Sequence, residues 1–284
     1  DAILDYREGW HRIEGLEAEL AFINRGMHIR GVAGKILGAD LEAVEVRIDD
    51  LAHARLDIEG RARGPLADML RFVRESPLSG GPGDTLGTVQ AQGAADLRLG
   101  LVIPLAEHRP ARVAGGVRLA DNRLALPAWE LAFDQLQGVL EFTERSVSSR
   151  VLQARLDCVP GRVDVEFAQR DGRPATRVAV RGALPLLRRL KADEGDRLWA
   201  RVGGDSEWTA QVDLPREAPP GTPVTLEFES DLRGIVVDLP APFGKTAEEV
   251  YPFRLRTTVT PGDSLRPLYL QYGEHRAAAE LQRQ

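Results

Sequence analysis

The residues able to carry out chemistry are few and scattered along this chain. Its five histidines are His11, His28, His53, His108 and His275. No two of them stand three to five residues apart, so they predict no paired zinc site. No serine occupies the pattern G-x-S-x-G, which excludes a nucleophile elbow. The single cysteine, Cys158, allows neither an intrachain disulfide nor a cysteine metal cage, and we interpret it as a small core residue.

Two other groups of residues imitate binding or catalytic motifs. Gly244-Lys245-Thr246 looks like the end of a phosphate-binding loop, but that motif needs a glycine where this chain has Leu239. Carboxylates such as Asp49-Asp50 could supply a glycosidase pair, yet most carboxylates stand at alternating polar positions typical of a solvated strand face. The net charge of -6 argues against a nucleic-acid partner. We therefore predict a chain that is not an enzyme and uses no cofactor or metal.

The elements that would position any site are mainly β-strands. Apolar and polar residues alternate with a period of two, which places every second side chain on one face of a strand. The clearest segments are residues 44–49, 97–103, 163–167, 208–214 and 224–229. Turn residues such as Asp121-Asn122 separate these segments at short spacing, which predicts antiparallel strands.

Two short helices are expected, each directly after a proline that suits the first helical turn. They lie near residues 66–75, after Pro65, and near residues 186–194, after Pro185. Residues 246–250 and the tail from Glu274 are further helical candidates.

The first half of the chain resembles the second half at a shift of 120 residues. Leu16, Leu20, Phe22 and Arg25 match Leu136, Leu140, Phe142 and Arg145 in type, as in 142 − 22 = 120. We interpret this as a tandem β-repeat. Residues 1–120 form unit one with the first helix, and residues 121–284 form unit two with the second helix and the start of a further unit. The alternative is that any two β-rich segments share their apolar spacing.

A sheet with one apolar face must cover that face, because exposed apolar surface costs about 25 cal/mol for each Å². Two short helices are too few to cover this many strands. The sheet must therefore pack on a second sheet, close into a barrel, or curl around something apolar that is not protein. Aromatic residues are only 6% of the chain and the alternating residues are mainly Leu, Val and Ile. Such a face suits flexible acyl chains as well as a dry sandwich core.

The stretch 230–245 resembles the signature of the YhdP family of AsmA-like proteins. In that family a strand carries the pattern dLxG and ends in LPxPxGK. This chain has Asp231-Leu232-Arg233-Gly234, followed by Leu239-Pro240-Ala241-Pro242-Phe243-Gly244-Lys245. Further resemblance lies in residues 63–66, 76–78 and 119–140. The motifs are structural: Gly234, Pro240, Pro242 and Gly244 are expected to shape a turn or a strand end, since proline cannot donate to a sheet ladder.

The resemblance implies a mainly β fold, in which a long curved antiparallel sheet folds like a taco around a continuous apolar groove. It also implies a periplasmic segment of an envelope protein of Gram-negative bacteria, anchored in the inner membrane by a helix outside this chain. No run of about 18 apolar residues occurs in the sequence itself. The implied function is to bind phospholipid acyl chains and to help move phospholipids towards the outer membrane. Phospholipid and, through the full-length protein, the two membranes are the implied partners.

We predict that apolar residues of the alternating segments line the groove. These are Val44, Val46, Ile48, Leu97, Leu99, Leu101, Trp129, Leu131, Phe133, Leu140, Phe142, Val163, Val165, Phe167, Val212, Leu226 and Phe228. The same residues would form an ordinary sandwich core if the face were closed. Two other functions stay open. One is a structural or assembly module that binds another envelope protein by strand addition. The other is a carbohydrate-binding module that uses Trp10, Trp129, Trp199 or Trp208, or else a carboxylate-based hydrolase.

Overall fold

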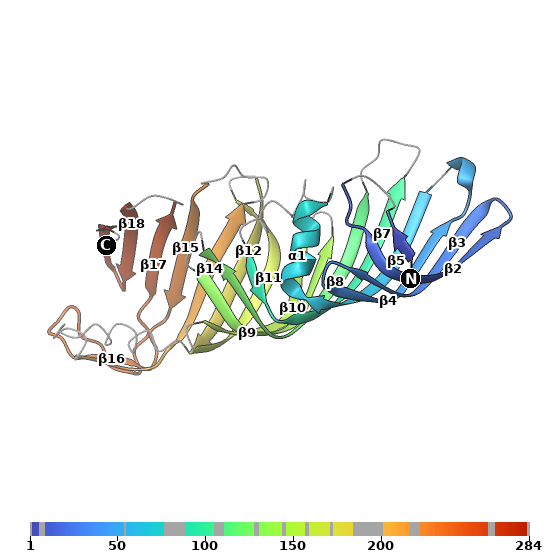
Figure 1. Ribbon diagram of the computed structural model, residues 1–284. Helices are drawn as coiled ribbons and strands as arrows, with labels where there is room; N and C mark the ends of the chain where they lie inside the picture. Colours follow the sequence, from blue (N-terminus) through green and yellow to red (C-terminus); the bar gives the residue numbers. More distant parts are fainter. Residues whose placement is uncertain are drawn as a thin grey trace.

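The protein is built around one long antiparallel sheet. The computed structural model describes residues 2–5, 9–53, 55–76, 89–104, 111–127, 131–143, 146–156, 159–170, 173–183, 201–215, 222–260 and 265–282. Figure 1 shows the sheet as an elongated curved layer, with the first strands at one end, the last strands at the other and α1 near the middle. The predicted fold class, mainly β with one long curved antiparallel sheet, is confirmed.

The elements of the first half follow one another closely along the chain. They are β1 (Ala2–Leu4), β2 (Ile13–Ile23), β3 (Gly26–Ile36), β4 (Ala39–Ile48), η1 (Leu51–His53), β5 (Arg55–Pro65), α1 (Leu66–Glu75), β6 (Gln90–Gln92), β7 (Ala94–Pro104) and β8 (Arg112–Leu126). The second half contributes β9 (Leu131–Thr143), β10 (Val147–Leu156), β11 (Val159–Arg170), β12 (Arg173–Ala183), β13 (Val202–Gly204), β14 (Glu207–Pro215), β15 (Val224–Ser230), β16 (Ile235–Val237), β17 (Phe253–Val259), β18 (Leu265–Tyr272) and β19 (His275–Gln282).

Strands that follow one another in the sequence also lie side by side in the sheet. Antiparallel pairing runs from β1 through β2, β3, β4 and β5 to β7, β8 and β9, and then through β10, β11, β12, β14, β15, β17 and β18 to β19. Two further short strands, β13 and β16, pair with each other in a separate small sheet. Several hairpins are closed by two residues, as between Ile23 and Gly26, where Asn24 has φ 54°.

The first predicted helix is confirmed, because α1 spans Leu66–Glu75 directly after Pro65. Leu66, Met69, Leu70 and Val73 follow the i, i+3, i+4, i+7 spacing of one helical face. The second predicted helix, near residues 186–194, lies outside the described residues.

Two other helical expectations were wrong. Residues 246–250 form bends with no helix. The tail after Glu274 is β19, because its residues pair with β18 from Leu265–Gln282 to Tyr272–His275. Its Arg-Ala-Ala-Ala sequence has good intrinsic helix propensity, but the unpaired edge of β18 decides its conformation.

The Asp121-Asn122 pair was expected to be a turn between strands, and it lies inside β8 instead. Asp121 adopts φ 61°, and the register of β8 against β9 shifts on both sides of Asn122. The neighbouring positions Gly93, between β6 and β7, and Gln135, in β9, also have positive φ. These residues form a line of bulges across adjacent strands, and such bulges bend a sheet locally.

The tandem repeat and its two units stay a prediction. Residues 120 and 121, at the expected boundary, both lie within β8.

The main apolar core is one cluster that follows the sheet. It includes Leu66 and Met69 of α1 together with Leu119, Leu136 and Leu152 of β8, β9 and β10, and it continues to Val224 and Val259. A smaller cluster consists of Trp208, Leu232 and Ile235, with Val202 of β13 and Val237 of β16 packed against it. We call the side of the sheet that carries α1 and the main cluster the inner face.

Candidate functional site

The inner face presents an unbroken apolar row that crosses twelve strands. Each residue of the row is the direct cross-strand partner of the next one. The row consists of Gly64, Ala95, Leu119, Gly138, Leu152, Val163, Val180, Ala210, Phe228, Leu255, Leu270 and Ala277. No member carries a polar side chain, so an apolar strip runs at right angles to the strands from β5 to β19.

A parallel row extends this strip towards the first strands. Ile29, Val46, Ile58, Leu101 and Val113 are successive cross-strand partners on β3, β4, β5, β7 and β8. Beyond Ile29 the strip reaches Leu20 of β2.

Exposure of the inner face differs along the sheet. Val163 and Val180 near the middle are buried, with 3% and 5% of their surfaces accessible. Leu20 and Phe22 on β2 are 56% and 68% exposed, although they continue the same face. An apolar face that is open to solvent at one end can accept an apolar ligand there.

The structure places the predicted lining residues as follows. Trp129 lies outside the described residues, and the side chains of Leu131 in β9 and Phe167 in β11 are not described. The other predicted residues lie on strands of the sheet and are buried or half-buried, and none is exposed. Cross-strand pairing brings Val46 opposite Ile58, Leu99 opposite Gly60, Leu140 opposite Val117, and Val165 opposite Val178. Whether these residues line a lipid groove stays a prediction.

Sequence reasoning missed several residues of the apolar rows. Phe253 and Leu255 of β17 show a clear alternation with Arg254 and Arg256, which could have placed this strand in the set. Val178 and Val180 of β12 carry a similar signal. Leu152 was harder to find, because the register of β10 against β9 shifts between Ser149 and Val151 and changes which positions face inward.

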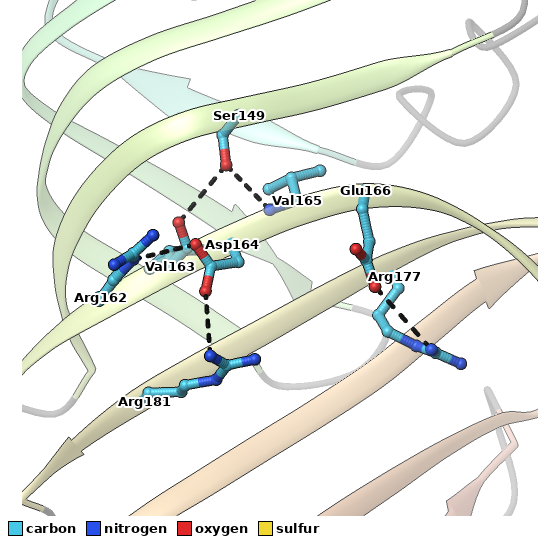
Figure 2. Close-up of polar contacts among 8 residues, drawn as sticks. All are labelled: Ser149, Arg162, Val163, Asp164, Val165, Glu166, Arg177 and Arg181. Atoms are coloured by element: carbon cyan, nitrogen blue, oxygen red, sulfur yellow. Dashed lines mark hydrogen bonds and ion pairs between the residues drawn. The ribbon is translucent and has the colours of Figure 1, made fainter.

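The outer face of the sheet carries charged side chains that form ion pairs with one another. Figure 2 shows Asp164 between Arg162 (3.1 Å) and Arg181 (3.9 Å), and Arg177 3.9 Å from Glu166. Arg177 also donates through Nε and Nη2 to the two carboxylate oxygens of its cross-strand partner Asp213, at 2.8 and 3.1 Å. This hydrogen bond is the main cause of the raised pKa of Arg177. Glu166 is well exposed, as a solvated strand face predicts, whereas only 12% of the Asp213 side chain is accessible.

Ser149 is a polar residue of β10 opposite Leu140 on the inner side, and its hydroxyl is used by the backbone. In Figure 2, Ser149 Oγ accepts from the Val165 amide at 2.9 Å and donates to the Val163 carbonyl at 3.4 Å. It thereby joins β10 to β11 where the β10 register shifts. The hydroxyl is held against the sheet and leaves the surface of the strip apolar.

Two elements cover part of the inner face. α1 packs against β5 and β6, with Leu66 and Met69 in the main cluster. The second cover is the segment that contains β13, β16 and the 230–245 signature, which we call the C-terminal cap. Its Leu232 and Ile235 pack on Trp208 of β14, and the Trp208 ring meets Phe253 edge-on at 5.0 Å.

Burial of Trp208 argues against its use as a sugar platform. Only 5% of its surface is accessible. Trp10 is half-buried against Phe72, with 5.9 Å between ring centroids. Trp129 and Trp199 lie outside the described residues.

The signature residues shape the C-terminal cap as expected. Gly234 adopts φ 93° immediately before β16, and the Phe243 amide donates to the Pro240 carbonyl in the turn that follows. Val237 and Lys245 then form an isolated antiparallel bridge. Leu239 to Lys245 is therefore a turn that returns the chain to β16, and no phosphate-binding loop is formed.

Lys245 is a structural residue of the C-terminal cap. Its side chain is buried, and Nζ donates to the carbonyls of Ile235 at 2.9 Å and Thr246 at 2.6 Å. Burial lowers the pKa of Lys245, and the nearby carboxylates of Glu249, Asp231 and Glu248 oppose this change.

Replacing Lys245 with methionine is expected to loosen the C-terminal cap. The substitution keeps the length of the side chain but removes both hydrogen bonds, and it leaves the buried Ile235 carbonyl without this partner at a cost of about 1–3 kcal/mol. Hydrogen exchange of the Val237 amide, which bonds to the Lys245 carbonyl, should become at least tenfold faster. The matched control is Lys35→Met at a mostly exposed lysine, and it should leave this amide unchanged. Equal exchange in both variants contradicts a structural role for Lys245.

Among the described ranges, no group of three or more His, Cys, Asp or Glu residues lies together in an arrangement able to hold a metal ion. In the same part of the chain, no helix is long and apolar enough to cross a membrane.

Comparison with known proteins identifies a family whose model matches this chain. The family model described as "YhdP protein" matches residues 1–284. A curated protein described as "Intermembrane phospholipid transporter YhdP", from Escherichia coli (strain K12), is 28% identical over 259 residues. The alignment covers 86% of this chain and 19% of that relative, so the chain spans about a fifth of the relative's length. No solved structure matches this chain.

Proposed function

Because the chain belongs to the YhdP protein family, we propose that it binds phospholipid acyl chains along its inner face. It does so as a periplasmic segment of a longer protein that is anchored in the inner membrane. The bound lipid moves along the sheet towards the outer membrane, and the segment carries out no reaction of its own. The observation that supports this most strongly is the unbroken apolar row from Gly64 to Ala277.

The chemistry of the row fits an acyl chain. Each methylene that leaves water for an apolar surface contributes about 0.8 kcal/mol. Leu, Val, Ile and Ala side chains offer contact without hydrogen-bond requirements, so no polar group on the row selects a particular position along an acyl chain. The outer face of the sheet is charged, so it stays in contact with water while the inner face binds the acyl chain.

The direction of the row also fits transport. The row crosses strands, so its length grows by about 4.8 Å with each added strand. A longer chain of the same architecture would extend the same strip without a change in chemistry. The relative with which this chain aligns is a phospholipid transporter by its description, and the chain spans 19% of its length.

A structural or assembly role is the second candidate. A strand edge that is open can bind another protein by strand addition. This role predicts a specific protein partner and no dependence on lipid.

The test is extraction of the purified chain with organic solvent, followed by mass spectrometry of the lipids. An unrelated β-sandwich protein prepared in the same way is the control. We expect phospholipid close to one molecule or more per chain, with only traces in the control. Phospholipid at the control level in a folded preparation contradicts lipid binding by this segment and favours the assembly role.

A further inference from the structure

We propose that α1 is a hinged cover on the inner face, and that acyl chains reach the strip beneath it only when its C-terminal end lifts. The inference rests on the proposed function, because α1 and the acyl chains use the same face. α1 would then control the access of acyl chains to part of that face.

The N-terminal end of α1 is fixed to the sheet. Pro65 is the last residue of β5 and pairs with Ala94 of β7, and Leu66 begins the helix without a linker. The Leu66 amide donates to the Gly93 carbonyl at 2.9 Å. This end therefore has the geometry of a hinge.

The C-terminal end of α1 is held by segments that lie outside the paired strands. The Phe72 ring lies 5.9 Å from both the Trp10 and the His11 ring, and His11 Nε2 lies 3.1 Å from Glu75 Oε2. We call Trp10, His11, Phe72 and Glu75 the clasp. Trp10 and His11 precede β2 in the sequence, so the helix end can leave them without breaking any strand pairing.

The side of α1 that faces the sheet is apolar, like the acyl chain that we propose as the ligand. Leu66 and Met69 are buried in the cluster that contains Leu119 and Leu136 of the inner face, and Leu70 packs against it. The opposite side of the helix is polar, where Arg71 Nε donates to Glu75 Oε1 at 2.9 Å. Apolar contacts are non-directional, so the methylenes of an acyl chain can replace those of Met69 and Leu70 when the C-terminal end lifts. The polar side can face water in either position.

The position of α1 places it in the path of an acyl chain that moves along the sheet. α1 lies near the middle of the sheet in Figure 1, over β6 and close to β8 and β9. On one side lies the more exposed strip of β2 to β4, and on the other lie the strands from β10 onwards. A chain that moves along the row from one side to the other must pass beneath α1 or around it.

The experiment uses a phospholipid with a diazirine at the end of one acyl chain. It is incorporated in vesicles of phosphatidylethanolamine and phosphatidylglycerol and incubated with the whole 284-residue chain. After irradiation, mass spectrometry gives the ratio of cross-links in β6 to cross-links in β4. We compare the unmodified chain, Phe72→Ala, and a locked form in which Trp10→Cys and Phe72→Cys are joined by a short bismaleimide in a Cys158→Ala background. Phe243→Ala, the same truncation of a half-exposed ring in the C-terminal cap, is the matched control.

We expect Phe72→Ala to raise the β6 to β4 ratio at least threefold, the locked form to lower it below that of the unmodified chain, and Phe243→Ala to leave it unchanged. An equal ratio in Phe72→Ala and in the locked form, with β4 still labelled, overturns the hinged cover and leaves the lipid-binding proposal intact. Absence of cross-links from β4 and β6 in every form overturns both. The locked form still tests the cover if Phe72→Ala does not fold, because the linker holds the helix in place.

Discussion

Replacing Leu99 with aspartate is expected to remove most of the co-purifying phospholipid while the sheet stays folded. Leu99 is half-buried in β7, and its cross-strand partners on the inner face are Gly60 and Gly115. Because neither partner has a side chain, water can reach a carboxylate at this position. An aspartate in contact with hydrocarbon costs about 2.5–3.5 kcal/mol, which corresponds to roughly a hundredfold lower local occupancy. Extraction and quantitative mass spectrometry should show a several-fold lower ratio of lipid to protein.

The matched control places the same side chain on the other face of the same strand. Arg98 is exposed and adjacent to Leu99, so Arg98→Asp should keep the lipid content of the unmodified chain. Circular dichroism checks that both variants retain their strand content. A folded Leu99→Asp variant that keeps its lipid contradicts the prediction that Leu99 lines the lipid-binding face.

Replacing Asn122 with alanine is expected to cause a large loss of stability. Asn122 is 0% exposed. Its Oδ1 accepts from the Ala120 amide at 2.8 Å, and its Nδ2 donates to the Gln92 and Ala94 carbonyls at 3.1 and 3.0 Å. Truncation removes three part-buried hydrogen bonds, each of which contributes about 0.5–1.5 kcal/mol. We expect the free energy of unfolding to fall by about 3 kcal/mol or more, measured by urea denaturation.

Two further variants make this prediction specific. Asn122→Asp keeps the acceptor for Ala120 but puts a negative charge against the Gln92 and Ala94 carbonyls, so it should be at least as destabilising as alanine. Asn24→Gly changes an asparagine with positive φ at an exposed hairpin position and should alter stability by less than about 0.5 kcal/mol. A small effect of Asn122→Ala would mean that water replaces the side chain.

Many of the strands were predictable from the sequence because they obey a local rule. Residues 97–103 alternate apolar and polar side chains, and this pattern fits only a strand with one buried face. Leu66 to Glu75 combines helix-forming residues with an apolar stripe directly after a proline. The failures have non-local causes. Asp121-Asn122 has the residue types of a turn, but the carbonyls on both sides of Gly93 hold Asn122 inside a strand.

The candidate site could be predicted in its chemistry but only partly in its composition. The alternation identified Val163, Val165 and Val212, which the structure buries on the inner face. It could not show that α1 shares this face, because Met69 and Leu136, which belong to the same apolar cluster, are far apart in the sequence. It also could not show which strands are open to solvent: Phe22 and Phe228 look alike in sequence, and only Phe22 is exposed.

The uniformity of the row from Gly64 to Ala277 has a consequence for how any bound chain behaves. Outside the part covered by α1, successive positions along the row are all apolar, so they offer similar binding energies with low barriers between them. An acyl chain bound to such a surface has no single register. It diffuses in one dimension along the row. The net direction of its movement is set by where lipid is supplied and where it is removed. An image of the loaded protein should therefore show continuous tubular density along the strip, without a single resolved pose.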